Sequence, residues 1–425
     1  MTIIPSRDNL PGAQRAYPIY LALAGLSRFF FALIFTVNLI YQFEVAHLNP
    51  LQLVLVGTLL ETIAFLAEVP TGLVADVYSR RLSIIIGLVL IGAGFVLEGS
   101  VPTFAAILAS QVFWGIGSTF TSGATEAWLA DEVGALAAAP MYLRASQVGQ
   151  LGALAGTFAS VALASVRLNL PIVIGGGAFI GLAVFLALLM PEDGFRPTPT
   201  PERNSVQKLG STFSAGAAIV RASPVLLTIL GTIIFRGASS EAFDRLWQPH
   251  FVQDLAIPPL GQFKPIVWFG VISAAASLLS LGTTEFVRRR VDTTNHHAAA
   301  RSLLVLNVIL ALGVAGVGLA TNFWLAMVTY LVATICRTTG GPIYTAWINQ
   351  GLEPRSRATV LSIASQTDAL GQIAGGPVLG WVGNAVSLRA AITAASVLLL
   401  PALPLFARTL QRPEAEPLAL ATTDE

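Results

Sequence analysis

The sequence contains few charged residues and almost none of the residue patterns that build disulfides, metal sites and nucleotide sites. Only 11% of its 425 residues are charged, whereas soluble domains carry about 25%. It has one cysteine, Cys336, so no intrachain disulfide can form and the redox compartment cannot be inferred. It has no Walker-type phosphate loop and no metal-spaced His/Cys cluster, so we expect neither enzymatic activity nor a cofactor or metal. A net charge of +1 gives no reason to expect a nucleic-acid partner.

In place of charge, the chain has long apolar runs. Hydrophobic residues make up 54% of it, and a bilayer core about 30 Å thick needs about 20 apolar residues in each helix. Twelve such runs end at charged residues, Pro or Gly, at 17–43, 50–75, 82–100, 103–128, 142–166, 170–190, 224–249, 262–287, 302–319, 321–349, 357–382 and 384–407. We therefore predict an all-α protein embedded in a lipid bilayer. Residues 1–16 are polar and the first run has full spanning length, so we expect no cleavable signal peptide.

The basic residues concentrate on one side of this predicted arrangement. With both termini in the cytoplasm, 17 of the 24 Lys and Arg residues fall in cytoplasmic segments. The outer loops hold three of them, Arg167, Lys264 and Arg389, and the remaining four lie within the apolar runs. Because Lys and Arg are enriched in cytoplasmic loops, we predict cytoplasmic termini in a multi-pass protein of the inner (plasma) membrane.

A charged loop separates the second and third apolar runs. It reads Gly72-Leu-Val-Ala-Asp76-Val-Tyr-Ser-Arg80-Arg81. This segment resembles the loop between helices two and three of the major facilitator superfamily of transporters, whose pattern is roughly G-x-L-x-D-R-x-G-R-K. Gly72, Asp76, Arg80 and Arg81 stand at matching positions, whereas three other positions depart from the pattern. The resemblance implies a fold of twelve transmembrane helices and a role for this loop in closing a cytoplasmic gate.

The resemblance also implies a role for acids at the inner end of helix four. Glu126 and Asp131 lie there, near the charged loop, as Glu68 does at the inner end of helix two. In the family, acids at these places form a charge network that closes the gate. We therefore interpret Glu126 and Asp131 as gate residues rather than as substrate ligands.

The chain repeats itself at an offset of 219 residues. Residues 127–156 align without gaps on residues 346–375, and the alignment pairs an Ala-Trp, an Ala-Ser-Gln and two glycines. Parallel six-helix repeats of this kind describe the two halves of the family. We predict pseudo-symmetric halves at 17–190 and 224–408, a Pro- and charge-rich cytoplasmic linker at 191–223, a cytoplasmic N-terminus at 1–16, and a disordered cytoplasmic tail at 409–425.

Glycine-rich stretches of helices five and eleven resemble a further family pattern. Drug-exporting antiporters usually carry a Gly-Pro-rich stretch in helix five, and here the small residues are kept without the proline. Helix eleven keeps both. The matching residues are Gly149, Gly152 and Gly156 in helix five and Gly371, Gly375, Gly376 and Pro377 in helix eleven. Small residues let helices approach closely, and tight packing and a gating bend both remain open as their role.

Helix four departs from the antiporter pattern. The antiporters usually carry an Arg four residues before a Gly, and here Gly115 follows Gln111. The proton-coupling role given to that Arg cannot be carried over to this chain. Gln111 remains a candidate residue of the substrate cavity.

Ionisable residues inside the apolar runs are the main candidates for ion coupling or substrate binding, because a charge at the bilayer centre costs about 2.5–3.5 kcal/mol. By helical rise, Arg28, Glu61, Arg236 and Asp368 fall near the midplane, with Arg337 closer to the cytoplasm. One interpretation pairs Arg28 with Glu61 and Arg236 with Asp368 as structural ion pairs. In the other, an acid exchanges a proton, with Asp368 as the first candidate and Glu61 as the second.

The seventh run holds three more charged residues. Glu241 and Arg245 stand four apart and are expected to pair. Asp244 is expected to lie nearer the outer surface.

We predict a secondary active transporter for a small organic molecule, a drug or a metabolite, that works by alternating access and exports its substrate by proton antiport. Protons are favoured over sodium because the midplane carboxylates stand beside arginines rather than in a cluster of oxygen ligands. An importer of a small metabolite, in one version an anion held by Arg28 and Arg236, is the alternative, and a receptor or a membrane enzyme is more remote. We expect a monomer.

Overall fold

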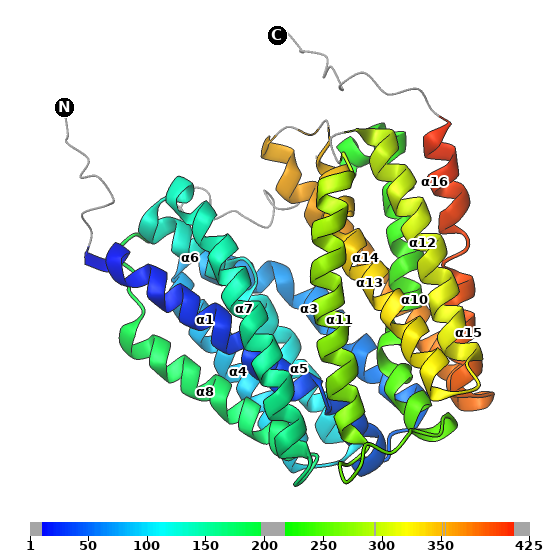
Figure 1. Cartoon of the computed structure of the whole chain (residues 1–425). Helices are drawn as coiled ribbons and strands as arrows, with labels where there is room; N and C mark the ends of the chain where they lie inside the picture. The colour runs from blue at the N-terminus through cyan, green and yellow to red at the C-terminus, as the bar shows by residue number, and fades with distance from the viewer. Residues whose placement is uncertain (1–10, 197–216, 293–294, 351, 353, 412–425) are drawn as a thin grey trace, which may run out of the picture. The chain divides into compact units, whose positions relative to one another are not determined.

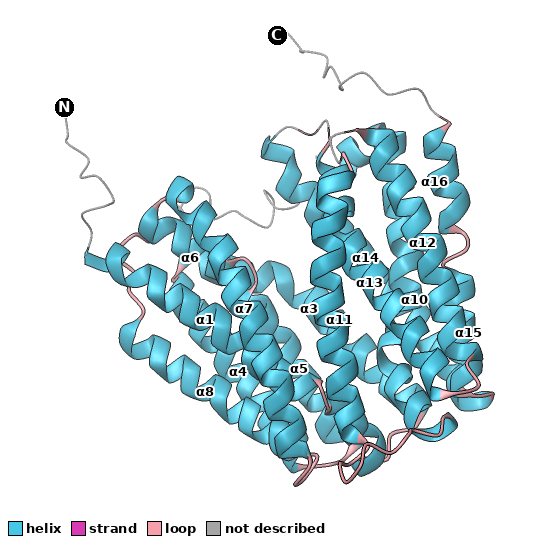
Figure 2. Ribbon diagram, in the orientation of Figure 1, coloured by secondary structure: helices cyan, strands magenta, loops and turns pink. Residues whose placement is uncertain are grey.

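The computed structural model describes residues 11–196, 217–292, 295–350, 352 and 354–411. The regular elements of this part are helices joined by short loops, and its only β-type pairing is an isolated bridge between Leu260 and Phe263 (Figure 2). The expected all-α class is confirmed. Most of the predicted N-terminus, the middle of the predicted linker and most of the predicted tail lie outside the described residues.

Each of the twelve apolar runs corresponds to helix (Figure 1). The helices that cover the first six runs are α1 (Pro11–Phe35), α2 (Asn38–Ile40), the π-helix η2 (Tyr41–Val45), α3 (Pro50–Val77), α4 (Arg80–Ser100), α5 (Phe104–Thr121), α6 (Ala124–Val133), α7 (Ala135–Ala164) and α8 (Leu170–Leu189). Those that cover the last six are α10 (Pro224–Asp254), α11 (Ile266–Arg290), α12 (His296–Leu319), α13 (Phe323–Asn349), α14 (Pro354–Ala385), α15 (Leu388–Leu398) and α16 (Ala402–Leu410).

Ten spans in the described part are long and apolar enough to cross a membrane. Helices α13 and α14 are the two further segments, and they have the length, at 27 and 32 residues. Their interiors are more polar, because α13 carries Arg337 beside two threonines and α14 carries Asp368 between two glutamines. Polar residues of this kind in membrane helices normally face a protein interior or a water-filled cavity rather than lipid.

Several helix boundaries differ from the predicted runs for local reasons. Gly123 and Gly134 have positive φ angles of 69° and 89°, a conformation that glycine adopts without steric cost. They delimit α6 as a separate helix, and α7 therefore begins at Ala135, seven residues before the predicted start. Helix α10 continues to Asp254, beyond the predicted end at 249.

Short polar side chains start many of the helices. Asn49 accepts from the backbone N–H of Gln52, which in turn accepts from the backbone of Asn49, so α3 begins with a full capping box. Ser79 starts α4 in the same way, by accepting from the backbone of Leu82. These caps satisfy backbone N–H groups that have no partner within the helix.

The chain divides into two compact units, and each is described by itself. The first contains residues 1–203 and 259–274. In it, α1 packs against α7 and α8, and α4 packs against α5 and α8, with α3 beside α5. Phe95, Trp128 and Phe179 are fully buried in its core.

The second unit contains residues 204–258 and 275–425. Helix α10 packs against α14 and α15, and α12 packs against α13 and α15. Its core contains Trp347 and Phe406, whose rings stack at 6.0 Å between centroids. Helix α11 is divided between the units after residue 274.

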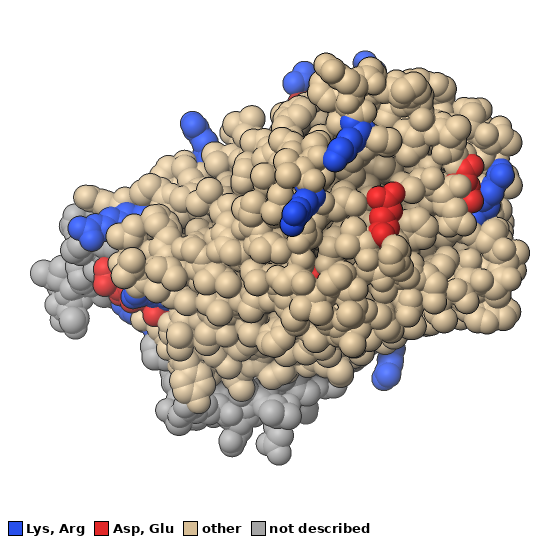
Figure 3. Space-filling view, turned by 90° about the horizontal axis from the view of Figure 1, so that it is seen from below, with Lys and Arg blue, Asp and Glu red and all other residues tan. Residues whose placement is uncertain are grey.

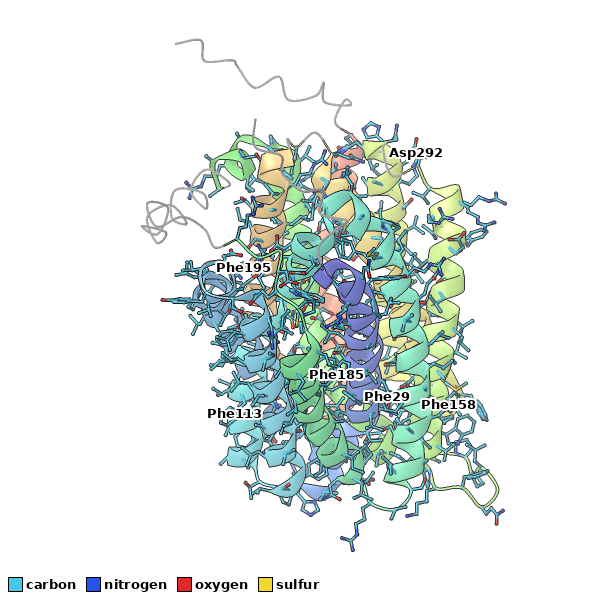
Figure 4. All side chains as sticks on the ribbon, turned by 90° about the vertical axis from the view of Figure 1, so that its left-hand side faces the viewer. Phe29, Phe113, Phe158, Phe185, Phe195 and Asp292 are labelled. Carbon is cyan, nitrogen blue, oxygen red and sulfur yellow. The ribbon has the colours of Figure 1, made fainter. Side chains whose placement is uncertain are left out.

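Large apolar side chains lie on the outside of the helices. Phe113 on α5 and Phe158 on α7 are 40% and 61% exposed and point outward (Figure 4). Seen from below, onto the ends of the helices, the molecule carries a small number of charged side chains on a mostly uncharged surface (Figure 3). Exposed apolar side chains along helices of spanning length, such as Phe113 and Phe158, are what contact with lipid requires.

Candidate functional site

Arg80 connects the charged loop to α6. Its Nε lies 2.8 Å from Asp131 Oδ2, and its Nη2 lies 3.7 Å from Asp76 Oδ1. The Asp76 side chain is 60% exposed, whereas those of Arg80 and Asp131 are mostly covered. Arg80 is thus the centre of a three-residue ion-pair group at the predicted cytoplasmic end of the first unit.

The other predicted gate residues have different surroundings. The Arg81 guanidinium donates to the carbonyl oxygen of Ala187 in α8. Glu126 is exposed on α6, and its carbonyl oxygen accepts from the Tyr142 hydroxyl at 2.8 Å. A Cβ atom at Gly72 would meet no neighbouring atom within 4 Å, so its own unit gives no steric reason for glycine at this position.

Glu192, which the sequence analysis did not single out, caps α4. Its Oε2 accepts from the Ser79 hydroxyl at 2.7 Å, and its Oε1 accepts from the backbone N–H of Arg81 at 2.9 Å. A carboxylate at a helix N-terminus satisfies free N–H groups and interacts favourably with the helix dipole. Glu192 thereby links the first residues of the predicted linker to the charged loop.

Two hydrogen bonds also join the segment around Glu192 to α6. The Trp128 indole donates to the carbonyl oxygen of Pro191 at 2.7 Å, and the backbone N–H of Gly194 donates to Glu132 Oε1 at 2.7 Å. A Cβ atom at Gly194 would lie 2.2 Å from the carbonyl oxygen of Asp131. Glycine is therefore required for this close approach to the residue that pairs with Arg80.

Arg337 in the second unit has a partner that was not predicted. Its guanidinium forms a two-point contact with Asp244 on α10, with Nη2 2.8 Å from Oδ2 and a second bond from Nη1. Our expectation that Asp244 lies nearer the outer surface stays a prediction. Helix α10 continues to Asp254, and this contact joins it to α13.

The expected pair on α10 is present. Arg245 Nε lies 2.9 Å from Glu241 Oε1, and the Glu241 side chain is 5% exposed. The pair is local to α10 because i and i+4 side chains lie on the same face of a helix.

Asp368 and Arg236 do not form a close ion pair. Among the described residues, the nearest partner of Asp368 is Gln372, whose Nε2 donates to Oδ2 at 3.0 Å. Arg236 lies over the Tyr344 ring, 5.1 Å from its centroid, and interacts with Asp368 only at longer range. The structure thus shows no direct ion pair between these two side chains, and a structural pairing at longer range stays a prediction.

The remaining midplane candidates lie in the first unit. Arg28 is exposed on α1, and its Cγ approaches the position that a Cβ atom would take at Gly149 to 3.1 Å. Glu61 is half-buried on α3, and its pairing with Arg28 stays a prediction. Gln111 is buried on α5 and donates to Glu98 at 3.2 Å.

The predicted packing glycines lie on α7 and α14, which correspond to helices five and eleven of the sequence analysis, and they occupy close helix crossings. A Cβ atom at Gly152 would lie 2.3 Å from the Gly25 carbonyl oxygen, and one at Gly156 would lie 2.3 Å from that of Phe29. In the same way, a Cβ atom at Gly371 would lie 2.3 Å from the carbonyl oxygen of Ile234, and one at Gly375 would lie 2.5 Å from that of Ala238. Thus α1 against α7 and α10 against α14 repeat one contact, and small residues permit it.

The same stretch of α14 contains two more predicted packing residues. Gly376 is buried, and Pro377 lies within the helix without ending it. Gly237 on α10 belongs to the same crossing, since a Cβ atom there would lie 2.3 Å from the carbonyl oxygen of Asp368. The backbone that carries Asp368 is therefore in direct contact with α10.

Comparison with known proteins identifies the family. The family model for the Major Facilitator Superfamily matches residues 20–364. A relative from Bacillus subtilis (strain 168), the uncharacterised MFS-type transporter YxaM, is 22% identical over 387 residues, which are 89% of this chain and 91% of that protein.

Solved structures share the fold. A bacterial homolog of the human lysosomal transporter Spinster, in an inward-facing and unoccupied conformation, superposes with a TM-score of 0.73 at 16% identity, covering 94% of this chain and 98% of the other. The nucleoside transporter NupG superposes with a TM-score of 0.72 at 14% identity, covering 94% and 100%. With a family model that spans most of its length, this chain belongs to the major facilitator superfamily of membrane transporters.

Proposed function

We propose that this protein is a secondary active transporter that exports a small organic molecule, a drug or a metabolite, by proton antiport. It works by alternating access in the bacterial inner membrane, with both termini in the cytoplasm, and it works as a monomer. The observation that carries the proposal is the charge arrangement of the second unit. Asp244 forms an ion pair with Arg337, and Glu241 forms one with Arg245. The close partner of Asp368 is instead the neutral amide of Gln372.

Asp368 suits a proton-carrying role because its charge is not needed to neutralise a close arginine. Its side chain is half-buried, and a carboxyl group in a site that alternates between wet and dry changes its proton affinity with its surroundings. Gln372 can donate to the carboxylate or accept from the protonated acid. Both protonation states therefore have a hydrogen-bond partner.

The Arg80 group supports a gating role for the charged loop. Arg80 interacts with two acids from different helices, and the exposed carboxylate of Asp76 remains accessible to other groups. An ion-pair group of this kind can exchange partners as a transporter changes state.

Import of a small, anionic metabolite is the alternative. The observation that favours it is Arg236, which stacks on Tyr344 and, within the described part of the chain, has no acid within 4.0 Å. A guanidinium held in this way can bind a carboxylate or phosphate on a substrate.

Purified protein in proteoliposomes with an imposed pH gradient tests both. Compounds are screened for uptake into inside-out and right-side-out vesicles. Export by antiport predicts substrate movement against proton flow that protonophore abolishes and sodium removal leaves unchanged. Substrate movement in the direction of proton flow would support the importer, and transport that persists with protonophore but stops without sodium would reject proton coupling.

A further inference from the structure

Another buried carboxylate lies in the first unit, at the end of α4 opposite Arg80. Glu98, two residues before the end of α4, is fully buried. Gln42 Nε2 donates to its Oε1 at 2.7 Å. The Ser110 hydroxyl and Gln111 Nε2 lie 2.9 and 3.2 Å from its Oε2. Three neutral side chains from two other elements thus converge on this one acid.

The two glutamine amides around Glu98 use their nitrogens in hydrogen bonds but not their oxygens. The Oε1 atoms of Gln42 and Gln111 are buried and have no hydrogen-bond partner among the described residues. Asn38, one helical turn before Gln42, has a buried Oδ1 atom in the same condition. Buried polar groups are normally paired, so the orphaned acceptors of the two amides that bond to Glu98 point to a missing positive ligand or proton donor.

The backbone at Gln42 is unusual too. Residues 41–45 form the π-helix η2, after a break in which Thr36 bonds to the carbonyl oxygen of Ala32. Tyr41 on the same turn donates to the carbonyl oxygen of Glu98 at 2.7 Å. Single π-turns are rare and occur often at functional sites. Here the π-turn accompanies the two side chains of η2 that bond to Glu98.

The charged surroundings of the cluster are sparse. Helices α5 and α8, which pack on α4, contain no ionisable residue. Arg80 and Arg81 lie at the other end of α4, about 27 Å away by helical rise. Helices α3 and α6 also contact α4, and their acids are Glu61, Glu68 and Asp76 of α3 and Glu126, Asp131 and Glu132 of α6. Tyr41 and Glu44 of η2, Arg28 of α1, and Arg167 in the loop whose Asn169 bonds to the carbonyl oxygen of Gly99 are further ionisable groups of this unit.

We propose that Glu98, Gln42, Ser110 and Gln111 form a binding site for a small monovalent cation, either a proton or a sodium ion. A half-turn of each amide brings its oxygen toward Glu98. There the oxygen either accepts from the protonated acid or joins the carboxylate and Ser110 as a ligand of the ion. As a coupling site this proposal rests on the transport function proposed above, whereas ion binding itself does not. It would give the first unit an ion site independent of Asp368.

The test measures binding in purified, detergent-solubilised full-length protein, so that it does not depend on transport. One arm titrates sodium, with potassium and choline as controls, and follows radioactive sodium binding and the unfolding midpoint. The other arm follows the infrared carbonyl band of protonated carboxyl groups as pH is varied. The variants are Glu98→Gln and Gln111→Ala, and the matched control is Glu44→Gln, which makes the same change at an exposed acid of η2.

A sodium site predicts saturable, sodium-selective binding that Glu98→Gln abolishes, that Gln111→Ala weakens about tenfold, and that Glu44→Gln retains. A proton site predicts no sodium effect and a carboxyl band that Glu98→Gln removes, Gln111→Ala moves and Glu44→Gln preserves. If Glu98→Gln does not fold, Gln111→Ala alone gives the same readouts. A protein that binds no sodium and whose carboxyl bands are the same in all variants would overturn the proposal, even if it transports substrate.

Discussion

At the scale of single residues, Asp368 is the acid whose role can be tested most directly. A purely structural role would have it neutralise Arg236 or Arg337, so that its removal would leave a buried arginine unpaired, at high cost to stability. Arg337 already has Asp244, and Arg236 stacks on Tyr344. The structure therefore weakens the structural interpretation.

We expect Asp368→Asn to express and fold normally, to bind substrate, and to lose pH-driven transport. The substitution keeps the size of the side chain and a hydrogen bond with Gln372, while it removes the ionisable group. Expression, substrate binding and proton-coupled flux are measured together. Wild-type pH dependence of flux in this variant would move the role to Glu61 or Glu98, and poor expression would restore the structural interpretation.

A second prediction at the residue scale concerns Glu192. We expect Glu192→Ala to lower the free energy of unfolding by about 1 kcal/mol, because α4 loses the carboxylate that accepts from Ser79 and Arg81. Asp193→Ala is the matched control, since Asp193 is exposed and stands next to Glu192. Thermal unfolding in detergent gives the comparison, and equal stability of the two variants would contradict the capping role.

At the scale of elements, the contact that matters most is the crossing of α1 with α7 and its counterpart, α10 with α14. In both, two glycines four residues apart meet backbone carbonyl oxygens. Helices in lipid associate by close packing rather than by a hydrophobic driving force. Loss of a single glycine therefore removes contact along the whole crossing.

We expect Gly152→Ala and Gly371→Ala to destabilise the protein by roughly 1–3 kcal/mol each, because the new methyl group would overlap a backbone oxygen and force the helices apart. Gly177→Ala on α8 is the control, because a Cβ atom there meets nothing within 4 Å. Unfolding midpoints of the three variants are compared. If Gly152→Ala is as stable as Gly177→Ala, the crossing is not the reason for glycine.

At the scale of the whole molecule, alternating access requires the cytoplasmic end to open and close. The Arg80 group is the described feature suited to this, because Arg80 interacts with Asp76 and Asp131 from two helices. Asp76 is the most exposed member. Its carboxylate can therefore change partners without a large desolvation cost.

We expect Asp76→Asn to insert and fold normally but to lose most transport, because the variant keeps the Arg80–Asp131 pair and removes the exchangeable charge. Flux in proteoliposomes and the unfolding midpoint are measured for this variant and for Glu126→Gln, an exposed acid on α6 that serves as comparison. Near-normal flux in Asp76→Asn would reject the gating role of Asp76.

The sequence by itself determined the class of protein, the positions of its twelve apolar helices and the repeat of glycine contacts. These depend on local properties: the length of the apolar runs, and small residues at a fixed spacing. The pair Glu241–Arg245 was predictable for the same reason, since one helix turn brings its members together.

Only the tertiary structure decided the partners of residues that are far apart in the chain. Asp244 and Arg337 are separated by 93 positions and Glu192 and Ser79 by 113. The amides around Glu98 come from η2 and α5. A charge in an apolar run indicates that a partner exists, because burial without one is costly. Which partner it has depends on how the helices cross, as the contact of α10 with α13 through Asp244 and Arg337 shows.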